Sequence, residues 1–344
     1  MHILLVKLSS LGDTIHTLPA LTDALRAIPD LKIDWVVEPA FKDIPAWHPS
    51  VKKIILMPLR QWRKNFFRPK TFLDIKRFFR ELRTTHYDLI IDAQGLLKSA
   101  IVAKCARGKI AGYDQHSIWE RSASFFYDYR YPVEKEQHAV TRIRKLFSQA
   151  LHYPFQDTTP NYQTISEKLP TLPFALDKKY VVFLHGTTWD SKHYPEIYWE
   201  ALLKKVAEKE IPIYLLWGNA DEKARAERFA KITPFVKILP KLMITQIAAV
   251  LKNASAVVTV DTGLGHLSAA MHTPTISLYG PSDAKLVGIV GPNQIHLQAQ
   301  FPCSPCLSMT CAYAKTHKTD VTPACFTTIG PDKVWEKLHV FLET

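Results

Sequence analysis

Apolar runs alternate with amphipathic stretches along the first half of the chain. Runs of apolar and β-branched residues, typical of strands covered on both faces, predict strands at residues 3–8, 32–39, 51–57, 87–95 and 109–113. Apolar positions three or four residues apart predict helices at 14–28, 72–83, 96–108 and 138–151. Strands that alternate with helices in this way indicate a parallel α/β sheet.

The same pattern restarts in the second half. Strands are predicted at 180–186, 211–219, 256–260 and 275–279, and helices at 195–209, 221–232, 244–254 and 267–271. We therefore predict two parallel-sheet domains, 1–152 and 179–330, joined by a linker at 153–178 that is rich in Pro and Thr. The last segment, 331–344, has helical spacing and is expected to complete the first domain.

A buried strand, a turn containing glycine and a short helix follow one another between Val257 and Asp283. Glycines permit positive φ and let a ligand approach the backbone, and a helix start presents unpaired N–H groups to an anion. This pattern favours a diphosphate site made by Asp261, Thr262, Gly263, Leu264, Gly265 and His266. A plain strand-turn-helix, with Asp261 or Thr262 as the N-cap, explains the same residues.

The loop after the first strand has one glycine, Gly12, followed by Asp13. The G-x-G-x-x-G fingerprint of dinucleotide-binding proteins is therefore absent from this loop, which argues against a dehydrogenase. Asp13 is expected at a helix start beyond the carboxyl end of a strand, where it could cap the helix or act as a general base. The residue pattern leaves both roles open, and one residue can serve both.

Loops in the second half offer further candidates. The stretch after the strand at 180–186 contains Thr187, Thr188 and Lys192, and hydroxyls with an ammonium group suit phosphate binding. Glu222 leads a predicted helix, where it could meet a ribose hydroxyl or favour the helix dipole. The stretch with Thr187, Thr188 and Lys192 is also explained as a polar surface loop that binds no ligand.

Positive charge is concentrated in the first half. Residues 1–150 contain 25 Lys and Arg against 15 Asp and Glu, and residues 151–344 contain 19 against 17, which together give the net charge of +12. The segment 59–70 carries Arg60, Arg63 and Lys64 with interleaved aromatic residues and no acid. The helix predicted after it is expected to bury Phe72, Ile75, Phe79 and Leu82. An anionic partner is indicated: nucleic acid, a membrane surface or a phosphorylated substrate, unless the segment is only a solvated basic face.

Apolar runs, motifs and cysteine content narrow the possible classes of protein. No apolar run approaches the ~18 residues of a spanning helix, and no secretory leader is visible, so we expect a soluble cytoplasmic protein. The sequence lacks the RNP, KH and C2H2 signatures of nucleic-acid-binding modules. Five cysteines do not suggest a disulfide scaffold. Cys303 and Cys306 have the spacing of a zinc-ligand pair, but the gaps to Cys311 and Cys325 are irregular, and no metal site is predicted.

Three motifs carry a resemblance to a known family. KLSSLGDTIHTLPAL, LHGTTWDSKHYP and VDTGLGHLSAAMHTPTISLYGPSD resemble the lipopolysaccharide heptosyltransferases of glycosyltransferase family 9, most closely the branch that adds the first heptose of the inner core. The resemblance runs from Met1 to the final helix. It implies a GT-B fold, with two Rossmann-like domains facing across a cleft. A second heptosyltransferase branch, acting on a later acceptor, shares the architecture and is the alternative.

The resemblance implies an inverting transfer of heptose from ADP-L-glycero-β-D-manno-heptose to a Kdo residue of Kdo2-lipid A, without a metal or cofactor. Asp13 matches the proposed base, and Lys192 would act on the diphosphate. The donor-binding residues implied are Thr187, Thr188, Lys192, Glu222, Met243, Asp261, Thr262, Gly263, Leu264, Gly265 and His266. Acceptor binding is implied for Ser9, Ser10, Gly12, Arg60, Arg63 and Lys64. The partners would be the two substrates and the anionic cytoplasmic face of the inner membrane, with no nucleic acid.

Overall fold

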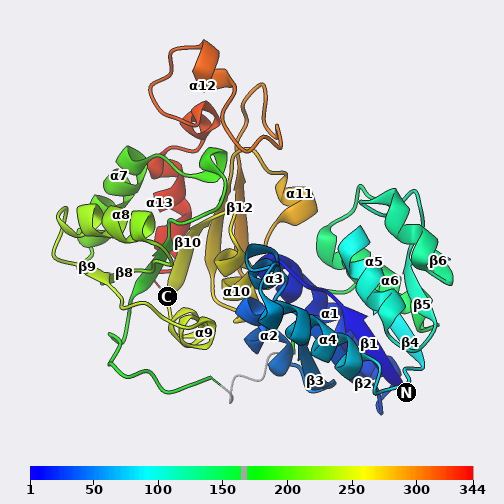
Figure 1. Ribbon diagram of the computed structural model, residues 1–344. Helices are drawn as coiled ribbons and strands as arrows, with labels where there is room; N and C mark the ends of the chain where they lie inside the picture. The colour runs from blue at the N-terminus through cyan, green and yellow to red at the C-terminus, as the bar shows by residue number, and fades with distance from the viewer. Residues whose placement is uncertain (164–168, 344) are drawn as a thin grey trace. The chain divides into compact units, whose positions relative to one another are not determined.

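The chain forms two compact units, Met1–Ser166 and Glu167–Thr344, in a computed structural model that describes residues 1–163 and 169–343. Each unit is built around a parallel sheet whose described part has six strands (Figure 1). The described residues of the predicted linker contain no helix or strand. Within the part of the chain that the structure covers, no helix combines the length and apolar character that membrane crossing needs.

The first unit alternates strands and helices as predicted. Its strands are β1 His2–Val6, β2 Lys32–Val37, β3 Val51–Leu56, β4 Leu89–Asp92, β5 Ile110–Tyr113 and β6 Tyr129–Tyr131. Its α-helices are α1 Leu11–Ala27, α2 Asp43–Ala46, α3 Leu59–Lys64, α4 Pro69–Leu82, α5 Leu97–Cys105 and α6 Ala139–Ala150.

The strands of the first sheet lie in the order β3-β2-β1-β4-β5-β6, and every adjacent pair is parallel. Residues Ile3 to Val6 of β1 are fully buried. Because successive side chains of a strand point to opposite faces, both faces of the sheet must be covered. The strand order reverses between β1 and β4, and ligands of such sheets bind beyond the carboxyl ends at that point.

The second unit repeats this architecture. Its strands are β7 Val181–Leu184, β8 Ile213–Leu215, β9 Val236–Ile238, β10 Ala256–Val260, β11 Thr275–Tyr279 and β12 Gln294–Gln298. Its α-helices are α7 Glu196–Ala207, α8 Ala220–Ala230, α9 Ile244–Lys252, α10 Gly263–Ala270, α11 Ala284–Val287, α12 Tyr313–Thr316 and α13 Pro331–Val340. The parallel order β12-β11-β10-β7-β8-β9 reverses between β7 and β10, so their exits are the expected ligand site.

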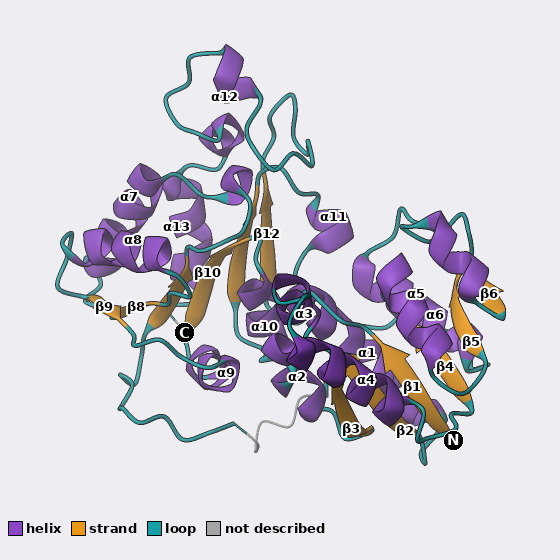
Figure 2. Cartoon of the chain, in the orientation of Figure 1, coloured by secondary structure: helices purple, strands orange, loops and turns teal. Residues whose placement is uncertain are grey.

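The C-terminal helix belongs to the second unit, and the prediction that it completes the first domain is wrong. Val334 and Leu338 of α13, with Leu342 beyond it, lie in the apolar core of the second sheet. Helices α7, α8 and α13 gather on one side of that sheet (Figure 2). The apolar stripe of α13 is therefore covered by neighbours from its own unit, among them α7.

Several predicted boundaries move. Helix α1 begins at Leu11 rather than Thr14, and α10 begins at Gly263 rather than Leu267. The face predicted to be buried on the basic helix is also wrong in part: α4 buries Thr71, Phe78 and Leu82, whereas Phe72 is exposed. Phe78 packs edge-on against Trp62 of α3, with ring centroids 5.5 Å apart, and this contact sets the rotation of α4.

Candidate active site

The loop after β1 is held by a side chain from the neighbouring strand exit. Oε1 of Gln94, in the loop after β4, accepts the N–H groups of Leu8 at 3.0 Å and Ser9 at 3.2 Å. The two strands are paired up to Val6 and Asp92, so their exits lie side by side. Gln94 therefore fixes the backbone that leads into Ser10 and α1.

Asp13 combines a capping role with an accessible carboxylate. It is the third residue of α1, and its Oδ2 accepts both the N–H and the hydroxyl of Ser10, each at 2.8 Å. Its Oδ1 lies 3.6 Å from Nζ of Lys7, and its side chain is 43% exposed. Ser10, rather than Asp13, is the N-cap. A carboxylate surrounded by donors and open to solvent is suited to accept a proton from a hydroxyl.

Asp92, at the end of β4, is fully buried. Its carboxylate accepts hydrogen bonds from Tyr127 at 2.7 Å, from the Ser99 hydroxyl at 2.9 Å, and from the N–H groups of Gln94 and Gly95. Burial raises the pKa of Asp92, and these hydrogen bonds oppose that rise. Asp92 is thus a positioning residue that fixes the turn carrying Gln94.

The predicted acceptor cations lie near the exit of β2. Nε of Arg60 is 2.9 Å from Oε2 of Glu38, the residue that follows β2. Arg63 and Lys64, in the last turn of α3, are exposed. Strand β2 is the neighbour of β1, so Arg60 is anchored one strand away from the loop that carries Asp13.

The segment 63–77 exposes apolar and basic side chains together. Its exposed large apolar residues are Phe66, Phe67, Phe72 and Leu73, and Phe67 is 96% exposed. Its exposed basic residues are Arg63, Lys64, Arg68, Lys70, Lys76 and Arg77. We call this stretch the aromatic-basic segment.

In the second unit, an ion pair links the exits of β7 and β10. Nζ of Lys192 lies 2.7 Å from Oδ2 of Asp261, and their side chains are 17% and 9% exposed. The same ammonium group lies 4.2 Å above the ring of Trp189, and Ser282 donates its hydroxyl to Asp261. Thr187 donates its hydroxyl to the Asp261 carbonyl at 3.0 Å. These contacts bring loops after three strands to one place.

A pocket of about 250 Å³ opens beside this pair. Five predicted donor residues line it: Thr187, Thr188, Glu222, Thr262 and Leu264. Trp217 and Lys241 also line it and were not predicted. Nζ of Lys241 lies 5.9 Å from the centroid of the Trp217 ring. The pocket thus combines hydroxyls, a carboxylate, an ammonium group and an aromatic ring, the groups that bind nucleotides.

Glu222 reaches over the end of β7 because Gly186 has no side chain. Its Oε2 accepts the N–H of Gly218 at 2.6 Å, which ties the first turn of α8 to the loop after β8. A Cβ placed on Gly186 would lie 2.5 Å from Oε1 of Glu222, closer than such atoms approach. Glycine at 186 is therefore what allows this carboxylate to lie in the pocket wall.

The turn after β10 differs from the predicted one. Gly263 and Gly265 belong to the first turns of α10, and neither has positive φ. The N–H of Gly265 already donates to the Thr262 carbonyl at 3.0 Å, so it is not presented to a ligand as predicted. Gly265 is needed for packing, since a Cβ there would lie 3.0 Å from Cγ2 of Thr259. His266 is buried in the same helix.

Met243 does not line the pocket. It is an exposed N-cap of α9, and its N–H donates to Oε1 of Gln246 at 2.9 Å. The preceding residues, Lys241 and Leu242, line the pocket instead. The predicted contact of Met243 with the donor stays a prediction.

The chain matches a known family. The family model described as "Glycosyltransferase family 9 (heptosyltransferase)" matches residues 75–317, more than half of the chain. The chain belongs to glycosyltransferase family 9. It is therefore a glycosyltransferase, as its three motifs predicted.

Relatives within family 9 align over nearly the whole chain. The lipopolysaccharide heptosyltransferase 1 of Pseudomonas aeruginosa is 46% identical over 99% of this chain and 98% of its own length. The lipopolysaccharide heptosyltransferase 1 of Escherichia coli K12 is 45% identical over 87% of this chain and 94% of its own length.

Solved structures confirm the predicted GT-B class. The E. coli heptosyltransferase WaaC with ADP superimposes with a TM-score of 0.86 at 39% identity, covering 99% of this chain and 100% of that one. WaaC with ADP-2-deoxy-2-fluoro heptose superimposes with a TM-score of 0.83 at 39% identity, covering 99% of each chain. E. coli heptosyltransferase II, at 18% identity and a TM-score of 0.75, shares the fold.

The sequence did not reveal what two residues of this family 9 site contact. Gln94 acts through its hydrogen bonds to a loop 85 residues away, and such a pairing is set by strand order alone. Trp217 lies inside the stretch predicted as a strand at 211–219, whereas β8 ends at Leu215, so the early end of the strand places Trp217 at its exit.

Proposed function

We propose that this chain transfers L-glycero-D-manno-heptose from ADP-heptose to a Kdo residue of Kdo2-lipid A, with inversion at the anomeric carbon. One observation carries the choice of acceptor. Of five relatives named lipopolysaccharide heptosyltransferase 1, four are 42–46% identical to the chain and the fifth is 27% identical. Those named heptosyltransferase 2 or 3 are 22–24% identical. This difference favours addition of the first heptose over a later one.

We assign ADP-heptose to the second unit. The pocket of about 250 Å³ provides Trp217 for contact with the adenine ring and Glu222 for a ribose hydroxyl. The Thr187 and Thr188 hydroxyls and the Lys192 ammonium group are the donors for the diphosphate. The similarity to WaaC with ADP and with a fluoro-heptose analogue supports this assignment.

The chemistry needs a base and stabilisation of the departing ADP. Asp13 accepts the proton of the Kdo hydroxyl as its oxygen forms a bond to C1 of the heptose, and the bond from C1 to the diphosphate oxygen breaks. A positioned base contributes about 10²- to 10⁴-fold to the rate. Negative charge then grows on the diphosphate, and Lys192 with the two threonine hydroxyls stabilises it. We expect equal rates with EDTA and with added Mg²⁺, because these side chains take the place of a catalytic cation.

We assign the acceptor to the carboxyl end of the first sheet. Kdo2-lipid A brings two carboxylates and two phosphates, which suit the guanidinium groups of Arg60 and Arg63 and the Lys64 ammonium group. Ser9, Ser10 and Gly12 lie at the start of α1 beside Asp13, where they can contact the Kdo residue.

The aromatic-basic segment suits the anionic cytoplasmic face of the inner membrane. Exposed aromatic rings favour the region between headgroups and acyl chains, while basic side chains pair with lipid phosphates. Sedimentation with vesicles of anionic lipid tests this. Phe67→Ser with Phe72→Ser should reduce vesicle binding, whereas Phe125→Ser, a change at an exposed phenylalanine outside the segment, should not. Equal vesicle binding by the parent chain, the double variant and the Phe125→Ser control would show that the segment does not bind the membrane.

The acceptor is tested with a pair of substrates. The purified chain and ADP-heptose are incubated with Kdo2-lipid A, or with the same lipid already carrying one heptose, and products are identified by mass. We expect one added heptose on the first acceptor only. Transfer only to the second acceptor would assign the chain to a later step, and transfer to neither would contradict the donor or the acceptor class.

A further inference from the structure

Four of the five cysteines lie in one irregular connection between β12 and α13. Cys303, Cys306, Cys311 and Cys325 fall within a stretch whose regular structure is one turn of α12 and a short 3₁₀ helix at Ala324–Thr328. Loops this long without regular structure are uncommon in compact domains and usually serve a function. We call residues 299–328 the cysteine loop.

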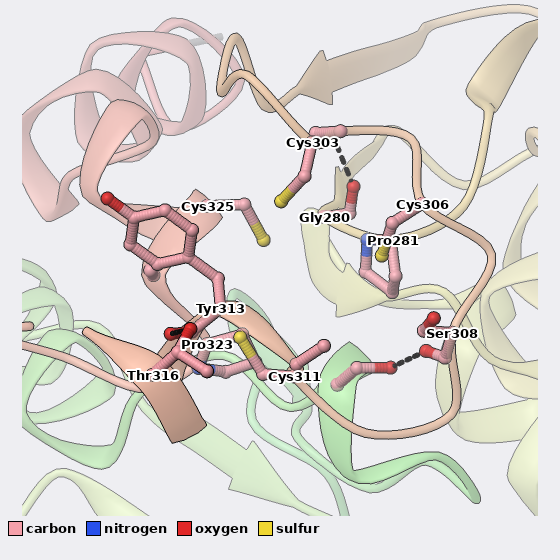
Figure 3. Close-up of a pocket in the computed structure, with 14 residues that line it drawn as sticks. Gly280, Pro281, Cys303, Cys306, Ser308, Cys311, Tyr313, Thr316, Pro323 and Cys325 are labelled. Atoms are coloured by element: carbon pink, nitrogen blue, oxygen red, sulfur yellow. Dashed lines mark hydrogen bonds between the residues drawn. The ribbon is translucent and has the colours of Figure 1, made fainter.

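The four cysteines line one pocket of about 300 Å³ within the second unit. None of the four forms a disulfide, and their thiols point toward the same space (Figure 3). Cys325 is buried at the base, where a Cβ on Gly280 would lie 2.9 Å from its Sγ. Cys303 and Cys306 are exposed at the rim.

We propose that Cys303, Cys306, Cys311 and Cys325 bind one divalent metal ion of the zinc type, as a four-thiolate site that holds the cysteine loop. Thiolate is the ligand that such borderline-soft ions prefer in closed structural sites, and two residues between the first pair is a frequent spacing. Each thiol releases its proton to solvent as its sulfur bonds to the metal. Among residues 1–163 and 169–343, no three such ligands are yet spaced to hold an ion. Binding therefore requires the four sulfur atoms to come closer together than they lie in this structure.

The cysteine loop forms hydrogen bonds beside each member of the Lys192–Asp261 ion pair. On one side, the backbone N–H of Ser191 donates to the Met309 carbonyl at 3.1 Å, and its hydroxyl donates to the Ser308 carbonyl. On the other side, the N–H of Leu307 donates to the Pro281 carbonyl at 2.9 Å, next to Ser282. A metal that fixes this loop would therefore help to position Lys192 and Asp261, and the cysteines would be positioning residues.

Metal content tests the site without any heptose transfer. The full chain is purified under reducing conditions, supplied with Zn²⁺, freed of excess ion and analysed for bound metal, and Co²⁺ is used in parallel to report thiolate ligation by its visible absorption. We expect one ion per chain. Cys303→Ser and Cys306→Ser, both at exposed positions that should leave folding intact, should weaken binding by more than about 100-fold. Cys105→Ser, outside the loop, should keep full binding.

A second measurement tests the positioning role. In Cys306→Ser the KM for ADP-heptose should rise by about tenfold with a smaller change in kcat, and Cys105→Ser should match the parent chain. Absence of bound metal with all thiols freely reactive would overturn the proposal. A Cys303–Cys306 disulfide in the purified chain, or undiminished metal binding in both serine variants, would overturn it as well.

Discussion

Lys192→Met removes one partner of a nearly buried ion pair. The Asp261 carboxylate then keeps only the Ser282 hydroxyl among the side-chain contacts described above. Removing one partner of a buried pair costs ~3–5 kcal/mol, and the remaining hydrogen bond offsets ~1–2 kcal/mol of it. We therefore expect the free energy of unfolding of the second unit to fall by ~2–3 kcal/mol. Asp261→Asn should cost only ~1 kcal/mol, because the long Lys192 side chain can reach solvent.

The assay is a double-mutant cycle followed by denaturant unfolding, with ADP affinity measured separately by calorimetry. The double variant should lose ~1–2 kcal/mol less than the sum of the single losses. ADP affinity in Lys192→Met should fall by about 10- to 100-fold, the value of a charged hydrogen bond, while Lys192→Arg should keep much of it. Additive unfolding free energies, or unchanged stability in Lys192→Met, would refute the assignment of this pair.

Three further expectations follow from individual residues. Asp13→Asn should lower kcat by about 10²- to 10⁴-fold while ADP binding is unchanged, and a normal kcat would exclude Asp13 as the base. Gly186→Ala should displace Glu222 and raise the KM for ADP-heptose; Gly218→Ala, where the nearest Glu222 atom would be 3.4 Å away, is the milder control, and equal effects of the two would contradict the argument. Burial lowers the pKa of His48 from 6.5 to about 4. As pH falls, His48 is therefore protonated in the unfolded chain before it is protonated in the folded chain. The stability due to neutral His48 is complete above about pH 6.5 and is lost toward pH 4, by ~3 kcal/mol in all, and denaturation of His48→Gln over this range should show a shallower pH dependence.

Strands in the middle of each sheet were predictable, and most edge strands were not. Residues 3–6 and 256–260 are buried on both sides and are therefore almost entirely apolar. The strands β6, β9 and β12 are all at sheet edges, where one side has no partner strand. They are short or mix polar with apolar residues, as in QIHLQ of β12, so they lack a continuous apolar signal.

The candidate site was predictable where its residues lie directly after strands. Thr187 and Asp261 closely follow β7 and β10, and Asp13 lies in the first turn of α1, the helix after β1. The rotation of α4 was not predictable, because Phe72 and Phe78 are equally apolar and only the contact with Trp62 decides which one is buried. Glycines at 263 and 265 suggested a turn, whereas close packing of a helix on Thr259 explains Gly265.

The hydrogen bonds from the loop after β1 to Gln94 have a consequence for engineering. The backbone N–H of Gln94 in turn donates to Asp92, whose carboxylate also accepts the Tyr127 hydroxyl, and none of these groups needs to touch a sugar. Random mutagenesis libraries screened for altered acceptor preference should therefore yield substitutions at this strand exit as well as among the surface cations. Redesign for an unnatural acceptor should therefore vary the residues at this strand exit and the surface cations together.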